Sequence, residues 1–221
     1  MKLRVLGSGT IALLQGRGAS CHLLELSSGE RLLLDSGPGC IERLLAIGLR
    51  PVDIDAVLHS HLHLDHCADL FPLLFHHRSP HGARRSPLLL NGAPGHSAFL
   101  EGVSKALDPK LLSVPHQIEE TPLDGVPRPL GSLPLTIQSW PANHPRNARV
   151  LRLEGATPRP WSLAYSGDTG PCEALLEAAK GVGWLLVECT NSERGGHGKH
   201  LGPGDVAEVI RQAKPRATAL I

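Results

Sequence analysis

Short apolar segments separated by glycine- and proline-rich turns make up the first part of the chain. Two apolar runs, 22–26 and 31–34, flank the turn at 27–30 and predict a β-hairpin. Apolar residues at helical spacing over 41–47, followed by a glycine, predict a helix. A further apolar run, 54–58, predicts a short buried strand that leads directly into a histidine-rich segment.

The remainder of the chain alternates strand and helix patterns, without a repeat at a fixed short period. Strands are predicted at 87–91, 135–139, 149–153, 161–165 and 184–188, and helices at 67–77, 96–107, 171–180 and 203–213. Strands outnumber helices, and helices recur between groups of strands. Because each sheet must cover its apolar face, this order favours helices packed on sheets, an α/β (α+β) class of fold.

Composition and charge are those of an ordinary globular protein. The chain has 221 residues, of which 41% are hydrophobic and 19% charged. A domain of this length buries roughly 70% of the surface that its unfolded chain exposes, so we expect one domain over 1–221. The net charge of +1 does not indicate a polyanionic partner. An aromatic content of 3% argues against a base-stacking platform for single-stranded nucleic acid.

The cysteines and the N-terminus predict a cytoplasmic protein. The five cysteines are odd in number and contain no C-x-x-C pair, which is a poor disulfide framework and suits a reducing compartment. The first ten residues predict a strand and a glycine turn rather than a signal peptide. No apolar stretch reaches the ~18 residues that a membrane span needs, so we expect no membrane partner.

The segment directly after the predicted strand 54–58 carries the strongest chemical signal. It contains His61, His63, Asp65 and His66 within six residues. Alternate residues of an extended segment point the same way, so His61, His63 and Asp65 can face one site, and a turn can bring His66 beside them. Such a density of nitrogen and carboxylate ligands suits zinc, with manganese or iron as alternatives. A histidine-rich surface loop is the other interpretation, but it has no reason to follow a buried strand.

This H-x-H-x-D-H pattern resembles the signature of the metallo-β-lactamase superfamily. Three further segments resemble motifs of that family in the same order: Leu-Asp-Ser-Gly-Pro-Gly at 34–39, the segment 140–145 around His144, and Ser-Gly-Asp-Thr at 166–169. The resemblance covers essentially the whole chain. It implies the four-layer αββα sandwich of the metallo-β-lactamase fold, and a homodimer is an accompanying expectation.

Within the superfamily, the chain is most similar to the ribonuclease Z and small phosphodiesterase branch. The likeness lies in the residues after the histidine cluster (68–74), the strand and turn at 87–95, and the segments 187–190 and 198–201. The resemblance implies a metal-dependent hydrolase that acts on a small phosphodiester or on RNA. We find no basic, glycine-rich insertion like the arm with which tRNA-processing members hold tRNA, which favours a smaller diester or a cyclic nucleotide.

The resemblance also assigns roles to the site residues. It implies two divalent metal ions, with His61, His63 and His144 on the first, Asp65 and His66 on the second, and Asp168 bridging both. A metal pair ~3.5–4 Å apart can generate a hydroxide nucleophile and stabilise the transition state. Asp65 and His200 are the expected catalytic residues, with His200 acting on the leaving group as a general acid or electrostatic stabiliser.

One expected ligand is missing from the pattern. The family has a further histidine for the second metal at the end of the strand after the last helix, whereas residues 216–221 resemble that strand and the sequence stops before it. We expect that the sequence is truncated there; a second metal site lacking one ligand is the alternative.

Other residues receive less specific interpretations. Asp35 either forms a turn or orients a ligand histidine. His59 is expected to pack at the strand end or to support the ligands, Cys67 to be a small buried residue, and the glycines at 7 and 9 to form a tight turn. The remaining histidines are assigned to surfaces or helix faces: His22, His76, His77, His81, His96, His116 and His197. The regions 79–135 and 193–200 are expected to shape the substrate pocket.

Two other function classes stay open. The same dimetal site serves thioester, lactone or sulfate ester hydrolysis elsewhere in the family, because a fold does not fix its substrate. A non-catalytic, metal-binding member is the third possibility, supported only by the missing last ligand. An oxygen-reducing di-iron role is disfavoured because His63 stands where that branch has a glutamate.

Overall fold

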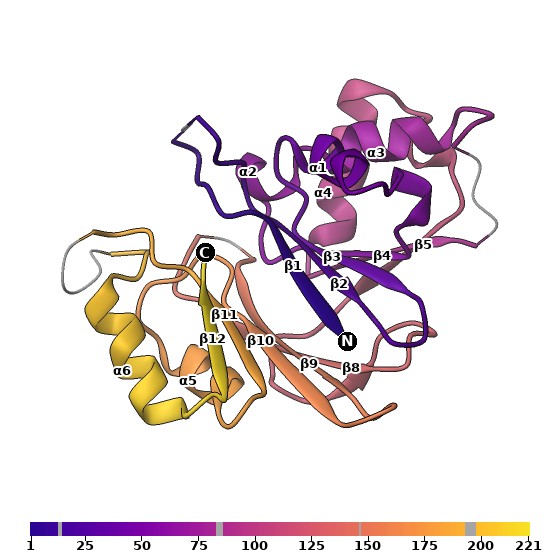
Figure 1. Cartoon of the computed structure of the whole chain (residues 1–221). Coiled ribbons are helices and arrows are strands. Elements are labelled where there is room, and N and C mark those ends of the chain that lie inside the picture. Colours follow the sequence, from indigo (N-terminus) through magenta and orange to yellow (C-terminus); the bar gives the residue numbers. More distant parts are fainter. Residues whose placement is uncertain (13–14, 83–85, 146, 193–197) are drawn as a thin grey trace. The chain divides into compact units, whose positions relative to one another are not determined.

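A computed structural model (Figure 1) describes residues 1–221 apart from 13–14, 83–85, 146 and 193–197. The chain divides into two compact units, Met1–Glu120 and Thr121–Ile221. Each unit contains one six-stranded mixed sheet with helices packed against it. In the part of the chain that the structure describes, no helix is both long enough and apolar enough to cross a membrane.

The sheet of the first unit has its strands in chain order. They are β1 (Lys2–Gly7), β2 (Cys21–Glu25), β3 (Arg31–Leu34), β4 (Ala56–Leu58), β5 (Leu88–Gly92) and β6 (His116–Glu120). β1, β2 and β3 pair antiparallel, and β3 to β6 pair parallel. Leu34 lies opposite Leu58, and Leu58 lies opposite Asn91. The carboxyl ends of β3, β4 and β5 therefore meet at one edge, where Asp35 and the histidine cluster follow.

Helices cover one face of this sheet. They are α1 (Cys40–Ala46), α2 (Leu64–Cys67), α3 (Leu70–His77) and α4 (His96–Leu107), with short 3-10 turns at Pro51–Asp53 and Leu111–Ser113. Alternate strand residues such as Leu33 and Val57 pack against Leu44, Leu73 and Leu100 of the helices, all at most 1% exposed. This period of two is what a strand with one helix-covered face requires.

The second unit is built in a similar way. Its strands are β7 (Arg128–Pro129), β8 (Thr136–Pro141), β9 (Arg149–Gly155), β10 (Trp161–Tyr165), β11 (Trp184–Val187) and β12 (Ala217–Leu220), in sheet order β12-β11-β10-β9-β8-β7. The pairs from β7 to β10 are antiparallel, and β10, β11 and β12 are parallel.

Two helices, α5 (Glu173–Ala179) and α6 (Pro203–Ala213), pack on this second sheet. Leu175 and Val206 contact a core that includes Ala164 and Leu185. α6 begins with proline at its first position, and the Asp205 carboxylate accepts the Gly202 N–H at 2.9 Å. This carboxylate satisfies a backbone donor that the first helical turn leaves without an intrahelical partner.

Most predicted elements are confirmed within one or two residues, but two helices differ. The helix predicted over 67–77 begins only at Leu70, as α3, and the separate helix α2 ends at Cys67. The break lies between them because the Asp69 N–H bonds to the Ser36 carbonyl at 2.8 Å and leaves the helical pattern. The helix predicted over 171–180 begins at Glu173, so Pro171 precedes it. Strands β6 and β7, whose residues are rich in polar side chains and proline, were not predicted.

The cysteine pattern predicts a poor disulfide framework, but one pair is bonded. Cys21 and Cys40 are bonded, with Cα atoms 5.8 Å apart across 19 residues of sequence. Cys21 opens β2 and Cys40 opens α1, and the Gly37 N–H bond to the Ser20 carbonyl holds these two starts together. Such a pairing depends on tertiary packing, so cysteine spacing alone does not reveal it.

Candidate metal centre

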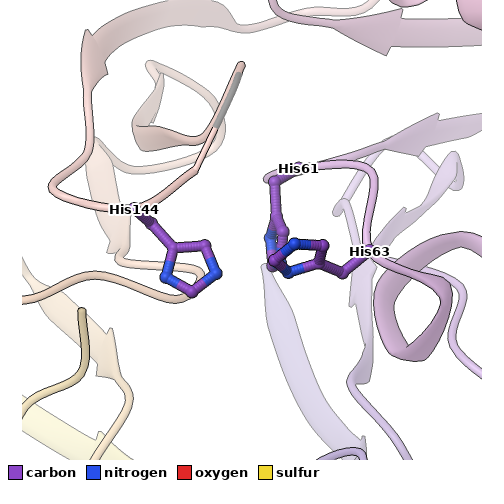
Figure 2. A group of neighbouring side chains, drawn as sticks. All are labelled: His61, His63 and His144. Carbon is purple, nitrogen blue, oxygen red and sulfur yellow. The ribbon is translucent and has the colours of Figure 1, made fainter.

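The histidine cluster of the first unit lies on the loop after β4 and on the short helix α2. His61 is 2% exposed, whereas His63 is exposed. His61 Nε2 and His63 Nδ1 lie 3.1 Å apart, and Figure 2 shows the two rings close together. His66 follows in α2, and its Nε2 lies 3.9 Å from an Asp65 carboxylate oxygen. The structure thus brings the four predicted ligands of this unit into one group.

Asp35 is buried beneath this group and orients it. One of its oxygens accepts the Ser60 N–H at 2.7 Å, and the other accepts the Ser60 hydroxyl at 2.7 Å and His66 Nδ1 at 2.7 Å. Its φ of +60° is the left-handed conformation that aspartate adopts more readily than most residues. Of the two interpretations of Asp35, the structure favours the one in which it orients a histidine, here His66, a predicted ligand.

Hydrogen bonding also fixes the histidine tautomers. The Ser60 hydroxyl has one proton and gives it to Asp35, so it accepts from His61 Nδ1–H at 3.0 Å. His66 likewise donates Nδ1–H to Asp35. On both histidines Nε2 is therefore the unprotonated nitrogen, the form in which imidazole binds a metal.

The charge of Asp35 is maintained in spite of its burial. Burial raises the pKa of its carboxyl, but the neighbouring imidazoles of His66, His61 and His59, together with the hydrogen bond from His66, hold that pKa far below its usual value. A permanent carboxylate at this point favours the Nδ1–H tautomer of His66.

The backbone after β3 also lies directly against the backbone of Asp65 and His66. A Cβ added to Gly37 would lie 1.9 Å from the Asp65 carbonyl oxygen, and the Ser36 N–H bonds to the His66 carbonyl at 2.7 Å. Only glycine fits at position 37 for this reason. The loop after β3 therefore holds the backbone of the predicted ligands, as well as His66 through Asp35.

The second unit carries the other predicted site residues in one cluster. His144 follows β8, Asp168 follows β10 and His200 precedes α6. His144 Nε2 and His200 Nδ1 lie 4.0 and 3.9 Å from Asp168 Oδ2. One ligand atom from each of the three lies within 4.8 Å of the others, so this cluster can hold a metal ion.

His144, also drawn in Figure 2, is held by the neighbouring loop. Its Nδ1–H donates to the Lys199 carbonyl at 3.0 Å, which leaves Nε2 unprotonated on the side of Asp168. The loop residues 193–197, including His197, lie outside the described residues, and so does part of the segment expected to shape the substrate pocket.

Glu188 is a site residue that the sequence interpretation did not assign. Its carboxylate accepts His200 Nδ1–H at 3.1 Å and the Thr169 N–H at 2.6 Å. The residue is 3% exposed. Burial raises its pKa, against the lowering effect of hydrogen bonds from Thr169 and Thr190. Glu188 thus orients His200 and places a negative charge beside it. The apolar strand ending in glutamate, twelve residues before a histidine, was the available signal.

Three histidines assigned to surfaces or helix faces are buried. His22 is on strand β2 and fully buried, so its assignment is wrong: its Nε2 lies 3.3 Å from Ser20 Oγ. His96 is on the buried face of α4, and its Nε2 lies 2.9 Å from His59 Nδ1. His59 also contacts Ser36 Oγ at 2.9 Å, in agreement with a supporting role. His77 is buried on α3, and the exposed His81 agrees with its assignment.

Of two smaller interpretations, the one for Cys67 agrees with the structure and the one for the glycines at 7 and 9 does not. Cys67 is buried, and burial raises the pKa of its thiol to about 12, so it is a packing residue and not a nucleophile. The Gly9 N–H bonds to the Gly18 carbonyl at 2.7 Å, and a Cβ on Gly7 would lie 2.0 Å from the Ala19 carbonyl oxygen. The two glycines therefore allow a close approach to the backbone at residues 18–19, and the predicted tight turn is wrong.

Burial of His22 predicts an acid-sensitive contribution to stability. Desolvation lowers its pKa from 6.5 to about 4, so the unfolded chain binds the extra proton between these values. The contribution of neutral, buried His22 to the free energy of unfolding is fully present above pH 6.5 and is lost as the pH falls to about 4. The loss over this range is roughly 3 kcal/mol. Urea unfolding of metal-free His22→Gln should show a smaller acid-induced loss than the parent. An equal loss in both proteins would contradict this assignment.

Comparison with known proteins identifies the class. A family model described as a β-lactamase superfamily domain matches residues 30–221, so the chain belongs to that superfamily. The metallo-β-lactamase fold protein YhfI from Bacillus subtilis superposes with a TM-score of 0.82 over 99% of this chain and 83% of that one, at 20% identity. The predicted metallo-β-lactamase fold is thereby confirmed.

Two relatives show to which proteins of the superfamily the chain is similar. An uncharacterized protein of Mycobacterium tuberculosis is 32% identical over 229 residues, which cover 100% of this chain and 80% of the relative. A ribonuclease Z of Mycolicibacterium gilvum is 30% identical over 202 residues, which cover 84% of this chain and 68% of the relative. The resemblance to the ribonuclease Z branch is confirmed, and membership of the superfamily supports a metal-dependent hydrolase.

Proposed function

We propose that the chain is a metal-dependent phosphodiesterase. Its ligands for two divalent ions would be His61, His63 and His144 on the first, Asp65 and His66 on the second, and Asp168 on both. Zinc fits this set of nitrogen and carboxylate donors well, and manganese and iron also accept it. The metals would provide Lewis-acid activation of water and neutralise charge on the phosphoryl oxygens.

One observation carries the proposal. Three of the proposed ligand histidines donate Nδ1–H to a protein oxygen: His61 to Ser60, His66 to Asp35 and His144 to Lys199. Each therefore presents an unprotonated Nε2. Histidines that bind metals use this arrangement, because the second hydrogen bond fixes the tautomer and the ring orientation. A chance cluster of histidines has no reason to repeat it.

The remaining residues can perform the proton chemistry. His200 donates Nδ1–H to Glu188, so its Nε2 is the atom left to exchange a proton with a leaving group. The Glu188 carboxylate holds the imidazole in this orientation through the 3.1 Å hydrogen bond. We propose His200 as the general acid and Glu188 as the residue that positions it.

A small phosphodiester is the proposed substrate class. The similarity to a ribonuclease Z supports phosphodiester chemistry, while the sequence lacks an insertion resembling a tRNA-binding arm. The test is a panel of three substrates offered to the zinc- or manganese-loaded chain: bis(p-nitrophenyl) phosphate, a carboxylic thioester and a lactone. The proposal expects chelator-sensitive hydrolysis of the phosphate diester above the others. Preferential hydrolysis of the thioester or the lactone would contradict the proposed substrate class but would not contradict the proposed metal site.

Replacing His200 separates acid catalysis from metal binding. His200→Ala should reduce turnover about 10²–10⁴-fold, the usual contribution of a general acid, with little change in bound metal. Metal content measured by atomic emission and hydrolysis rates measured in parallel give both quantities. Loss of metal in the variant would instead make His200 a ligand, a role that its position near Asp168 also permits.

A further inference from the structure

A cavity lies in the unit Thr121–Ile221, away from its histidine cluster. Its volume is about 620 Å³. Three of its lining residues place it at the amino ends of three neighbouring strands: Trp161 begins β10, Gly183 precedes β11 and Arg216 precedes β12. Asp168 and Glu188 follow the opposite ends of β10 and β11. The cavity and the candidate metal centre are therefore at opposite ends of the same strands.

The cavity has one flat aromatic side chain and open backbone around it. The Trp161 indole lies against the backbone of Gly155, where a Cβ would be 2.4 Å from the indole Nε1. Gly181, with φ +61°, has nothing within 4 Å of its Cβ position. Pro134, Leu135 and Pro160 supply further apolar lining. An aromatic face beside apolar walls suits a planar ring.

Its polar groups favour an anion. The only acidic side chain among the described lining residues is Glu154, and Arg152 already neutralises it through contacts of 2.6 and 2.8 Å. The Arg216 guanidinium is exposed and has no hydrogen-bond partner among the described residues. Lys180 and Lys214 are exposed within two residues of lining positions. The charge left at this cavity is therefore positive.

Ser162 adds a hydrogen-bond donor. Its Oγ accepts the Gly183 N–H at 2.9 Å, so the hydroxyl proton stays available to a ligand. No acceptor for that proton lies among the described parts of the chain. An arginine and a hydroxyl at one cavity are the groups that commonly bind a phosphate.

We propose that this cavity is a second ligand site, which binds a nucleoside monophosphate. The base would stack on Trp161, and the phosphate would bind Arg216 and Ser162. The volume is within the roughly 300–1,000 Å³ of small-molecule sites. Aromatic stacking accepts any base, so specificity for the phosphate would exceed specificity for the base. This site is independent of the hydrolytic activity proposed above.

Titration of adenosine monophosphate into the His63→Ala chain tests the proposal, because that background disables the candidate metal centre. Calorimetry and tryptophan fluorescence should show saturable binding at or below about 1 mM. Adding Arg216→Gln should weaken binding about tenfold or more, since a charge-assisted bidentate contact is lost. Arg50→Gln, an exposed arginine of the other unit paired with Asp53, is the matched control and should bind as the background does.

Three results would overturn the proposal. Undiminished binding to Arg216→Gln would show that Arg216 does not bind the phosphate. Adenosine binding as tightly as its monophosphate would show that no phosphate is recognised. Absence of saturable binding in the His63→Ala background, with a melting temperature equal to the parent's, would exclude a nucleotide site in this cavity.

Discussion

His63→Ala is expected to abolish metal-dependent phosphodiester hydrolysis while leaving a folded protein. His63 is exposed on the loop after β4, so its removal leaves no cavity in the core. Its Nδ1 lies 3.1 Å from His61 Nε2, and we propose both rings as ligands of one ion. A metal site that loses one of its protein ligands loses both affinity and catalytic geometry, so we expect turnover to fall by at least about 10²-fold.

The matched control is His81→Ala. His81 is an exposed histidine of the same unit, between α3 and β5, and it should leave hydrolysis unchanged. Both variants should keep the parent's circular dichroism and melting temperature without metal. Retained full activity in His63→Ala would remove His63 from the site, and an equal loss in His81→Ala would show that the assay reports stability.

Asp35→Ala is expected to have the largest effect on stability. The substitution leaves His66 Nδ1–H and both Ser60 donors without their buried acceptor. Each buried donor left without its acceptor costs about 1–3 kcal/mol, and alanine at a φ of +60° adds backbone strain. Urea unfolding of the metal-free proteins measures the difference.

Two further substitutions isolate the cause. Asp35→Asn keeps the shape and tolerates the left-handed backbone, so it should be less destabilising than alanine while still weakening metal binding. Asp124→Ala removes an exposed aspartate that is paired with Arg128 and should change stability little. A loss in Asp35→Ala no larger than that in Asp124→Ala would contradict the role given to Asp35.

The local pattern of the sequence was sufficient for most of the fold. Apolar runs such as 161–165 and 184–188 are long enough and sufficiently bounded by turns to locate buried strands. The pattern failed where tertiary contacts decide. The break between α2 and α3 depends on the Ser36 carbonyl, which competes for the Asp69 N–H from another part of the chain.

The same distinction holds for the candidate site. His61, His63, Asp65 and His66 are adjacent in sequence, so their density is visible without a structure. Their supporting contacts are not visible. The pairing of β4 with β5 places His59 beside α4 and so beside His96, 37 residues away.

Glu188 and the disulfide were missed for a related reason. Glu188 ends an apolar strand like several other polar residues, and only the fold brings its carboxylate to His200. A hairpin and a turn separate Cys21 from Cys40. The spacing of the cysteines in the sequence does not reveal that these elements bring the two residues together. In each case, a contact between distant segments determines the role of the side chain.

The most direct test of the proposed dimetal hydrolase is a metal titration of the chelator-stripped chain, followed by its hydrolysis of bis(p-nitrophenyl) phosphate. We expect no activity without metal, a rise on adding zinc or manganese, and saturation near two equivalents of bound ion per chain. Hydrolysis that is unaffected by stripping and reloading, or a chain that binds neither ion, would contradict the account.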